Sequence, residues 1–169
     1  MPAYDFAYMP AQWSGFLSAE VGASAALTGL LFVAVSINLA KIIAFPHLTP
    51  RAAKALVTLV GILFAASLCL VPGQSKNLLG AELVVVGIAA WIMITVTQRA
   101  HSRGNPYINR SQKLLHGVLA ELSAIPIAVC GVSLLCSRGG GLYWLVPAVI
   151  ISFASALLDA WVLLIEIQR

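Results

Sequence analysis

The sequence predicts an all-α integral membrane protein, a bundle of five transmembrane helices that forms a single domain over residues 1–169. Hydrophobic residues make up 60% of the chain, charged residues make up 9%, and the mean hydropathy is +0.95. Soluble domains carry about 25% charged residues, so this composition excludes an ordinary soluble domain. Apolar runs of about 20 residues, enough to cross a hydrocarbon layer of about 30 Å, recur along the chain. The predicted spans cover approximately residues 20–44, 50–71, 78–98, 114–136 and 142–167.

The segment before the first span, residues 1–19, is rich in aromatic side chains: Tyr4, Phe6, Tyr8, Trp13 and Phe16. Aromatic residues favour the membrane–water boundary, so we expect this segment to lie in the interface as a short helix or coil. A cleavable signal peptide has a lysine or arginine ahead of its apolar run, and this segment has neither. The first span is therefore predicted to remain in the mature protein.

The first span carries small residues on one side of its predicted helix. At about 100° per residue, that side includes Gly22, Ala25, Ala26 and Gly29. Gly22 and Ala26, and likewise Ala25 and Gly29, have the small-xxx-small spacing through which membrane helices approach closely. We expect this side to be a helix-packing face, with the other spans packed beside the first.

The opposite side of the first span is partly polar, with Glu20, Ser24 and Asn38 separated by Leu27 and Leu31. A line of this kind can border a constricted water path for ions or protons. Two neighbouring helices can equally satisfy its polar groups. The sequence leaves both interpretations open.

Turn residues separate the later spans. Thr49 is a predicted N-cap with Pro50 at the first helical position, which starts the second span, and Pro72 ends it with Gly73. The hydrophilic stretch 99–113 separates the third span from the fourth. A run of three glycines then leads into the fifth span.

The basic residues predict the orientation of the chain. One set flanks the first and third connections and the end of the chain: Lys41, Arg51, Lys54, Arg99, Arg103, Arg110, Lys113 and Arg169. The other side of the membrane has Lys76 and Arg138. This bias predicts an N-terminus outside and a cytoplasmic C-terminus. It also accounts for the net charge of +4, so nucleic acid is not expected as a partner.

Acidic residues inside the spans are candidates for an ion or proton pathway, because a carboxylate in a bilayer is costly unless it is paired, protonated or hydrated. Glu20 and Glu82 are predicted near the outer ends of their helices, and Glu121 and Asp159 lie deeper, at similar depth. No lysine or arginine is predicted at that depth, so these two acids are expected to share a proton if they meet. Ser155 shares the helix side of Asp159.

Pro126 is a predicted helix kink in the fourth span. A proline cannot donate a hydrogen bond to the carbonyl four residues earlier, so the Leu122 carbonyl becomes a free acceptor beside Glu121. A broken helix next to an acid is typical of ion sites in transporters, but proline also forms simple kinks in membrane helices. Ion or proton handling and hydrogen-bonded helix packing both remain open for Glu121 and Asp159.

Motifs for catalysis, metal binding and cofactor binding are absent from the sequence. The three histidines are His47, His101 and His116. They are not expected in facing spans, as a bis-histidine haem requires, so only single-histidine haem or pigment binding stays open. The three cysteines have no CxxC spacing and are expected to be small core residues. The sequence therefore predicts no enzyme, no cofactor and no metal site.

The opening pattern WSGFLSAEVGASAALTGLLFVAVSINL starts at Trp13, and the motifs IIAFPHL and LVPGQS follow it. In these motifs the chain resembles a group of small, uncharacterised polytopic membrane proteins of bacteria, which has no established activity to carry over. The resemblance extends to Ser75. It implies a multi-pass protein of the bacterial cytoplasmic (inner) membrane.

Two classes of function are consistent with the sequence, and the lipid bilayer is a partner in both. In the first, the chain forms a homo-oligomeric channel or transport protein, in which the polar side of the first span or the Glu121/Asp159 site lines a path for ions or protons. In the second, it is a non-catalytic accessory or scaffold subunit of a larger membrane complex. Its small face and aromatic N-terminal segment are then docking surfaces.

Overall fold

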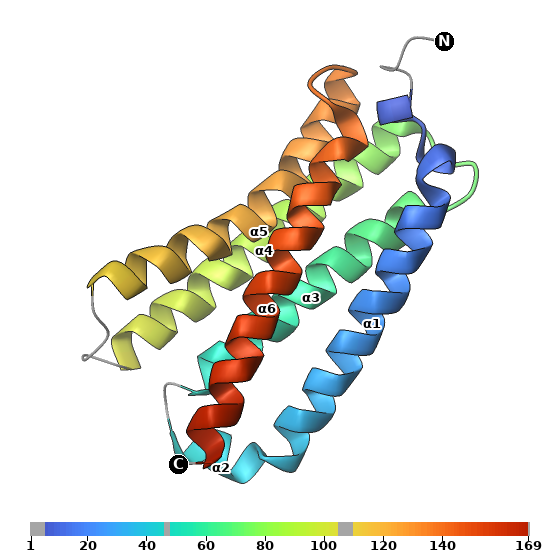
Figure 1. Cartoon of the computed structure of the whole chain (residues 1–169). Coiled ribbons are helices and arrows are strands. Elements are labelled where there is room, and N and C mark those ends of the chain that lie inside the picture. Colours follow the sequence, from blue (N-terminus) through green and yellow to red (C-terminus); the bar gives the residue numbers. More distant parts are fainter. Residues whose placement is uncertain (1–5, 46–47, 105–109, 169) are drawn as a thin grey trace.

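The computed structural model describes residues 6–45, 48–104 and 110–168, and the side chains of residues 100–104, 110–117, 119, 120 and 166–168 fall outside this description. Over these ranges the protein is all-α and has no strand (Figure 1). The α-helices are α1 (Ser14–Ile37), α2 (Leu39–Ala44), α3 (Leu48–Cys69), α4 (Lys76–Gly104), α5 (Arg110–Cys136) and α6 (Leu145–Gln168). Short 3-10 helices are η1 (Phe6–Tyr8), η2 (Pro10–Trp13) and η3 (Gly141–Trp144). The predicted all-α fold is confirmed.

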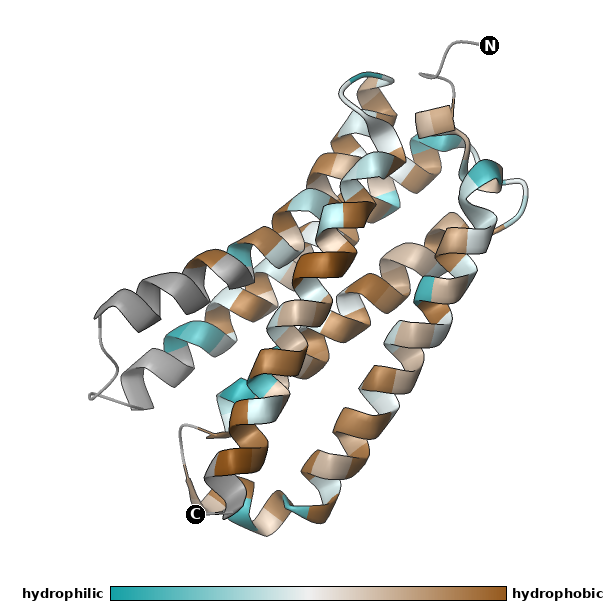
Figure 2. Cartoon of the chain, viewed as in Figure 1, coloured by the Kyte–Doolittle hydropathy of each residue, from teal (hydrophilic) through white to brown (hydrophobic). Residues whose placement is uncertain are grey.

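Four helical segments are long and apolar enough to cross a membrane: Pro10–Ile37, Leu48–Cys69, Lys76–Arg99 and Gly141–Ile165. In α5 the apolar stretch among the described residues is shorter and covers Glu121–Cys136. Brown, hydrophobic residues follow the long helices over most of their length (Figure 2). The chain therefore has the helix lengths and composition of a membrane protein.

The first helix differs in extent from its prediction. α1 begins at Ser14 and not at residue 20, because Leu17 already packs into the core. It ends at Ile37, and Asn38, with φ −103° and ψ 14°, separates it from α2. The Asn38 amide donates to the Ala34 carbonyl at 2.9 Å, so the side chain takes a helical acceptor at the break. The predicted span 20–44 is thus two helices.

The central helix of the bundle is α3, which packs against α1, α4 and α6. In the apolar stretch of α3, 56% of the residues are buried inside the bundle. In the apolar stretch of Pro10–Ile37, which contains α1, 11% are buried. In the main core, Ile62 of α3 packs with Leu17 of α1, Leu134 of α5 and Leu145 of α6. The expectation that the other spans pack around the first helix is therefore wrong. The buried positions of α1 lie on one side only, whereas those of α3 occur on several sides.

Two helices, α4 and α5, run side by side and come close enough to require glycine (Figure 1). A Cβ at Gly87 of α4 would lie 2.5 Å from the backbone nitrogen of Ala128 in α5. A Cβ at Gly131 of α5 would lie 2.6 Å from the carbonyl oxygen of Gly80 in α4. The backbones touch at these points, as the small residues of membrane helices permit.

The aromatic N-terminal segment folds over one end of the bundle. Trp13 packs edge-to-face on Tyr143, with 4.7 Å between ring centroids, and its indole N–H donates to the Phe6 carbonyl at 2.9 Å. Gly141, at φ +52°, passes so close that a Cβ there would lie 2.1 Å from the carbonyl oxygen of Ala7. These contacts hold η1 and η2 against η3.

Candidate functional site: an open helix face and a buried charge cluster

One side of α1 is open. Its small residues are all exposed, and we call them the small-residue face: Gly15, Ser18, Ala19, Gly22, Ala25, Ala26, Gly29 and Ser36. A Cβ built at Gly15, Gly22 or Gly29 would meet no atom of the described residues within 4 Å. The predicted packing residues Gly22, Ala25, Ala26 and Gly29 therefore lie on the outside of the bundle. The expectation that tight contacts within the bundle run along this side of the first helix is wrong.

The opposite side of α1 faces the core. Ser24 and Leu31 are buried there, and Glu20 and Asn38 are half-buried. The Ser24 hydroxyl donates to the Glu20 carbonyl at 2.6 Å, and the Asn38 amide donates to the Ala34 carbonyl at 2.9 Å. Both side chains thus satisfy their polar groups on their own helix, as membrane serines and asparagines often do when no water is near.

The Glu20 side chain lies beside a small apolar cavity that is also lined by Phe16, Ile62 and Leu145. Its Oε2 atom is buried and has no hydrogen-bond partner among the described residues. Burial of this carboxylate without a partner is unfavourable for its charged form. The structure does not bring Glu20 together with another predicted pathway acid.

Asp159 belongs to a buried group of charges that joins α6 to α3, and we call Asp159, Arg51 and Lys54 the charge cluster. The Asp159 Oδ1 atom accepts a hydrogen bond from the Arg51 Nε atom at 3.2 Å. The Asp159 Oδ2 atom lies 2.7 Å from the Lys54 Nζ atom. The exposed fractions of the three side chains are 3% for Asp159, 12% for Arg51 and 8% for Lys54. The carboxylate is therefore paired twice inside the protein.

This arrangement corrects the prediction that no basic residue lies at the depth of Asp159. α3 begins at Leu48, so Arg51 and Lys54 lie in its first two turns and direct their side chains inward to α6. A signal was present in the sequence, because basic residues three apart share one side of a helix and their long side chains reach several ångströms along it. Both residues also stand next to the first connection, where basic residues are expected outside the membrane.

Glu121 does not meet Asp159 in the structure. Its Oε2 atom accepts a hydrogen bond from the indole N–H of Trp91, which joins α5 to α4. Glu82 likewise accepts a hydrogen bond from the Gln74 side-chain amide. The two acids, which are expected to share a proton only if they meet, therefore do not pair, because each has a different partner from another helix.

Two further predicted residues lie in helix interfaces. Ser155 is buried in α6, one turn before Asp159. Pro126 is buried within α5, and the helix continues through it from Arg110 to Cys136. The proline therefore leaves the helix unbroken beside Glu121.

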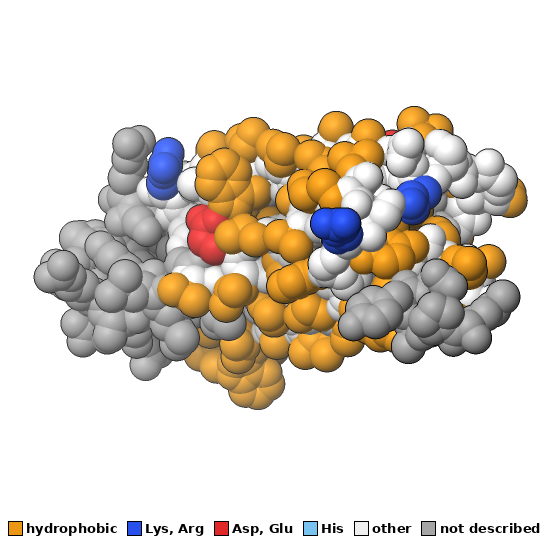
Figure 3. Space-filling model, turned by 90° about the horizontal axis from the view of Figure 1, so that it is seen from above, with side chains coloured by type: hydrophobic (Ala, Val, Ile, Leu, Met, Phe, Trp, Pro, Cys, Tyr) orange, Lys and Arg blue, Asp and Glu red, His pale blue; other side chains and the backbone are white. Residues whose placement is uncertain are grey.

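An apolar groove of about 260 Å³ lies between α1, α3 and α6. Leu27, Leu31, Leu59 and Leu163 line it, with Asn38 as its one amide-bearing side chain. Such a lining suits hydrocarbon and offers an ion no side-chain ligand besides that single amide. Hydrophobic side chains also cover much of the described part of the face shown in Figure 3, where charged side chains are scattered.

No group of three histidine, cysteine or acidic side chains that could hold a metal ion occurs within the described residues. His47 and the side chains of His101 and His116 lie outside them, as do the side chains of Arg103, Arg110, Lys113 and Arg169. Cys69 and Cys130 are buried as expected, but Cys136 is exposed at the end of α5.

Comparisons of the chain with protein-family models, with curated proteins and with solved structures each gave no match. The functional interpretation therefore rests on the geometry of the chain itself.

Proposed function

We propose that the chain is a multi-pass protein of the bacterial inner membrane that self-associates through the small-residue face of α1 and serves as a non-catalytic scaffold subunit. The observation that carries the proposal is that Gly15, Gly22 and Gly29 are spaced seven residues apart and open to the outside. A repeat of seven keeps one side of a helix facing a partner helix along its length.

A second copy of the chain fits this face because the face is complementary to itself. It carries no charge, and two such faces can bring their backbones close, which is the main source of attraction between helices in lipid. The outward surfaces of α4 and α6 carry large apolar residues, such as Val85 and Ile92 on α4 and Ile150 and Leu158 on α6, which suit contact with lipid chains. On α1 the large exposed residues begin after Gly29, at Leu30, Phe32, Val33 and Ile37, so the face is small only in its first four turns.

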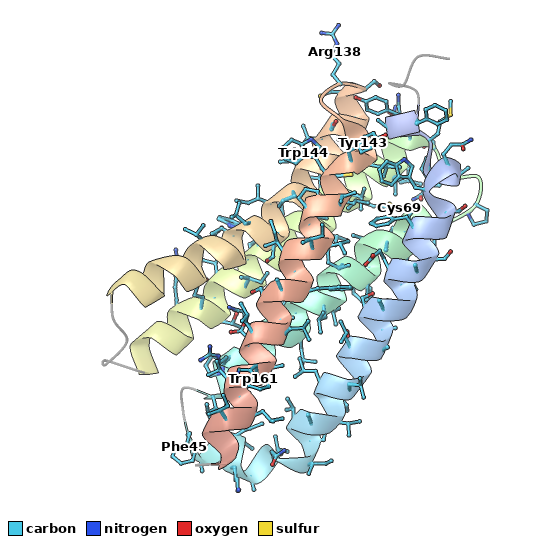
Figure 4. The ribbon with its side chains drawn as sticks, viewed as in Figure 1. Phe45, Cys69, Arg138, Tyr143, Trp144 and Trp161 are labelled. Atoms are coloured by element: carbon cyan, nitrogen blue, oxygen red, sulfur yellow. The ribbon has the colours of Figure 1, made fainter. Side chains whose placement is uncertain are left out.

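We extend the proposal to five spans, with α5 as the fifth. The long helices α1, α3, α4, α5 and α6 alternate in direction, so α1 starts at one end of the bundle and α6 finishes at the other (Figure 1). Tyr143 and Trp144 lie at the first end with Arg138 beyond them, and Trp161 and Phe45 lie towards the second (Figure 4). Aromatic residues at both ends suit two membrane boundaries, and the basic bias supports a cytoplasmic second end.

Ion or proton conduction is the less favoured function. Asp159, Glu121 and Glu82 each have a partner from elsewhere in the chain, and they do not line one passage with Glu20. Glu20 and Ser24 also face away from the small-residue face, so self-association through that face leaves them inside each copy.

Cysteine cross-linking tests the self-association. With the three native cysteines replaced by serine, we expect Ala26→Cys to form a disulfide-linked dimer in membranes under mild oxidation. Leu157→Cys is the matched control, because Leu157 is exposed near the middle of α6 as Ala26 is near the middle of α1. Equal cross-linking of the two variants would count against a specific α1 interface.

The exposed native Cys136 tests the orientation. A membrane-impermeant maleimide added to intact spheroplasts should label Cys136, and a Cys136→Ser variant should stay unlabelled. In the serine variant, an added Leu39→Cys at the other end should be labelled only after lysis. The reverse pattern would place the N-terminus in the cytoplasm.

A further inference from the structure

The charge cluster holds more positive charge than Asp159 can neutralise. Counted over the described side chains with their ordinary charges, Arg51 and Lys54 contribute +2 and Asp159 contributes −1, so about one positive charge is left in a site whose side chains are at most 12% exposed. An uncompensated charge in such a place is unfavourable. Among the described residues, Asp159 is the one acidic side chain that contacts either cation.

Hydrogen-bond donors are also in excess. A guanidinium has five N–H donors and an ammonium has three. The contacts to Asp159 involve the Nε atom of Arg51 and one side of the Lys54 ammonium group. Among the described residues, the two terminal nitrogens of Arg51 have no recorded acceptor. The paired donors of a guanidinium match the oxygens of a phosphate group.

The cluster lies at the level of a membrane boundary. Arg51 is the fourth residue of α3, so it lies about 5 Å along the axis from the start of that helix. Trp161, two residues after Asp159, is exposed and lies towards the same end of the bundle as Phe45 (Figure 4). Exposed tryptophan is typical of the head-group level. Basic pockets between membrane helices at this level bind the phosphates of anionic lipids.

We propose that Arg51 and Lys54, held in place by Asp159, form a binding site for one phosphate group. Arg51 is the most exposed member and contacts the phosphate with its terminal nitrogens. Lys54 is more deeply buried and attracts the phosphate through its positive charge. The phosphate belongs to the head group of an anionic lipid or to free inorganic phosphate, and both offer the same oxygens. This inference does not depend on self-association through α1.

The test measures phosphate-dependent binding to the purified full-length protein in detergent. Phosphatidylglycerol, phosphatidylcholine and inorganic phosphate are added separately, and retained lipid is counted by native mass spectrometry while stability is followed as the melting temperature. We expect phosphatidylglycerol to bind wild type more tightly than phosphatidylcholine. Arg51→Gln should weaken this binding by about tenfold or more, which is the loss expected for one charge-assisted pair.

Arg99→Gln is the matched control, because it removes the same charge from an exposed position on α4. Loss of phosphatidylglycerol binding in Arg51→Gln alone identifies a lipid head group as the source. Stabilisation of wild type but not Arg51→Gln by inorganic phosphate, without a lipid preference, identifies free phosphate. Equal losses in the two variants, or no preference for either anion, would overturn the proposal and leave a purely internal ion pair.

Arg51→Lys decides the matter if Arg51→Gln does not fold. This variant keeps the charge beside Asp159 and removes the fork of donors. We expect its affinity for the anion to fall several-fold, and unchanged affinity would contradict phosphate binding by the guanidinium.

Discussion

Two helices of this protein carry glycines seven residues apart, and they use them differently. In α4, Gly80 and Gly87 face α5, and a Cβ at Gly87 would lie 2.5 Å from the backbone of Ala128. In α1, Gly22 and Gly29 have the same spacing, but a Cβ at either would meet nothing within 4 Å in the part of the chain that the structure describes. The backbone of α5 packs against the first pair. The second pair has no such neighbour among the described residues, so it is available to a partner outside the chain.

The contrast shows what small-residue spacing means in a membrane helix. The spacing identifies the side on which another helix can approach the backbone closely, because small side chains do not hold the two backbones apart. It does not identify the partner. The partner of α4 is α5, the next helix in the chain, whereas the open side of α1 points away from α3, the helix on which α1 packs.

The largest effect is expected for Gly87→Ala. The added methyl group would lie 2.8 Å from the Ala128 Cα atom as well as close to its nitrogen, and backbone atoms cannot rotate away. We expect a loss of about 3 kcal/mol or more in the free energy of unfolding, at the upper end of overpacking costs. Reversible unfolding in mixed detergent micelles measures it, and wild-type stability in this variant would contradict the close approach of α4 and α5.

A smaller loss is expected for Gly141→Ala, where the close approach is to the N-terminal segment. The residue adopts φ +52°, which costs a non-glycine residue about 1–2 kcal/mol, and its Cβ would overlap the Ala7 carbonyl. The segment Phe6–Trp13 should then separate from η3 while the main core stays folded. Hydrogen exchange should show faster exchange in this segment and unchanged protection in α3. Uniform protection like wild type would show that η1 adjusts without detaching.

Gly29→Leu should act on association and spare the fold. Its side chain would enter open space in the single chain but separate two copies that meet at the small-residue face. We expect association in lipid to weaken by about 10- to 100-fold, which corresponds to about 1–3 kcal/mol of overpacking. Energy transfer between labelled copies in vesicles measures this change, with Ile150→Leu on the exposed side of α6 as a control.

The smallest effect is expected for Gly22→Ala in the folding of a single copy. Alanine favours a helix over glycine by about 0.5–1 kcal/mol, and the methyl group would meet no neighbour within the chain. The free energy of unfolding should therefore rise slightly or stay level in the assay used for Gly87→Ala. A loss as large as that of Gly87→Ala would show that the face is packed within the chain and would remove the contrast.

The sequence predicts the helical class and most helix positions, because long apolar runs and the turn residues at Pro72 and Gly139–Gly141 are local signals. It does not predict the break at Asn38 or the central place of α3. These features depend on how helices pack, and the apolar runs of α1 and α3 look alike in composition.

The site residues were predictable only in part. Asp159 stands out as an acid in an apolar helix, but its partners Arg51 and Lys54 come from a segment more than 100 residues earlier in the chain. Which helix lies beside α6 decides this pairing, and one sequence does not reveal it. For the same reason, the sequence leaves open whether Glu121 meets Asp159, and in the structure Glu121 accepts a hydrogen bond from Trp91.

The most direct test of self-association through α1 is the mass of the particle released from its own membrane in mild detergent, measured by native mass spectrometry for wild type and Gly29→Leu. We predict that wild type is a homo-oligomer and that Gly29→Leu is mainly a folded monomer. A wild-type monomer, a complex with other chains in place of a second copy, or a Gly29→Leu oligomer of unchanged mass would contradict self-association through this face.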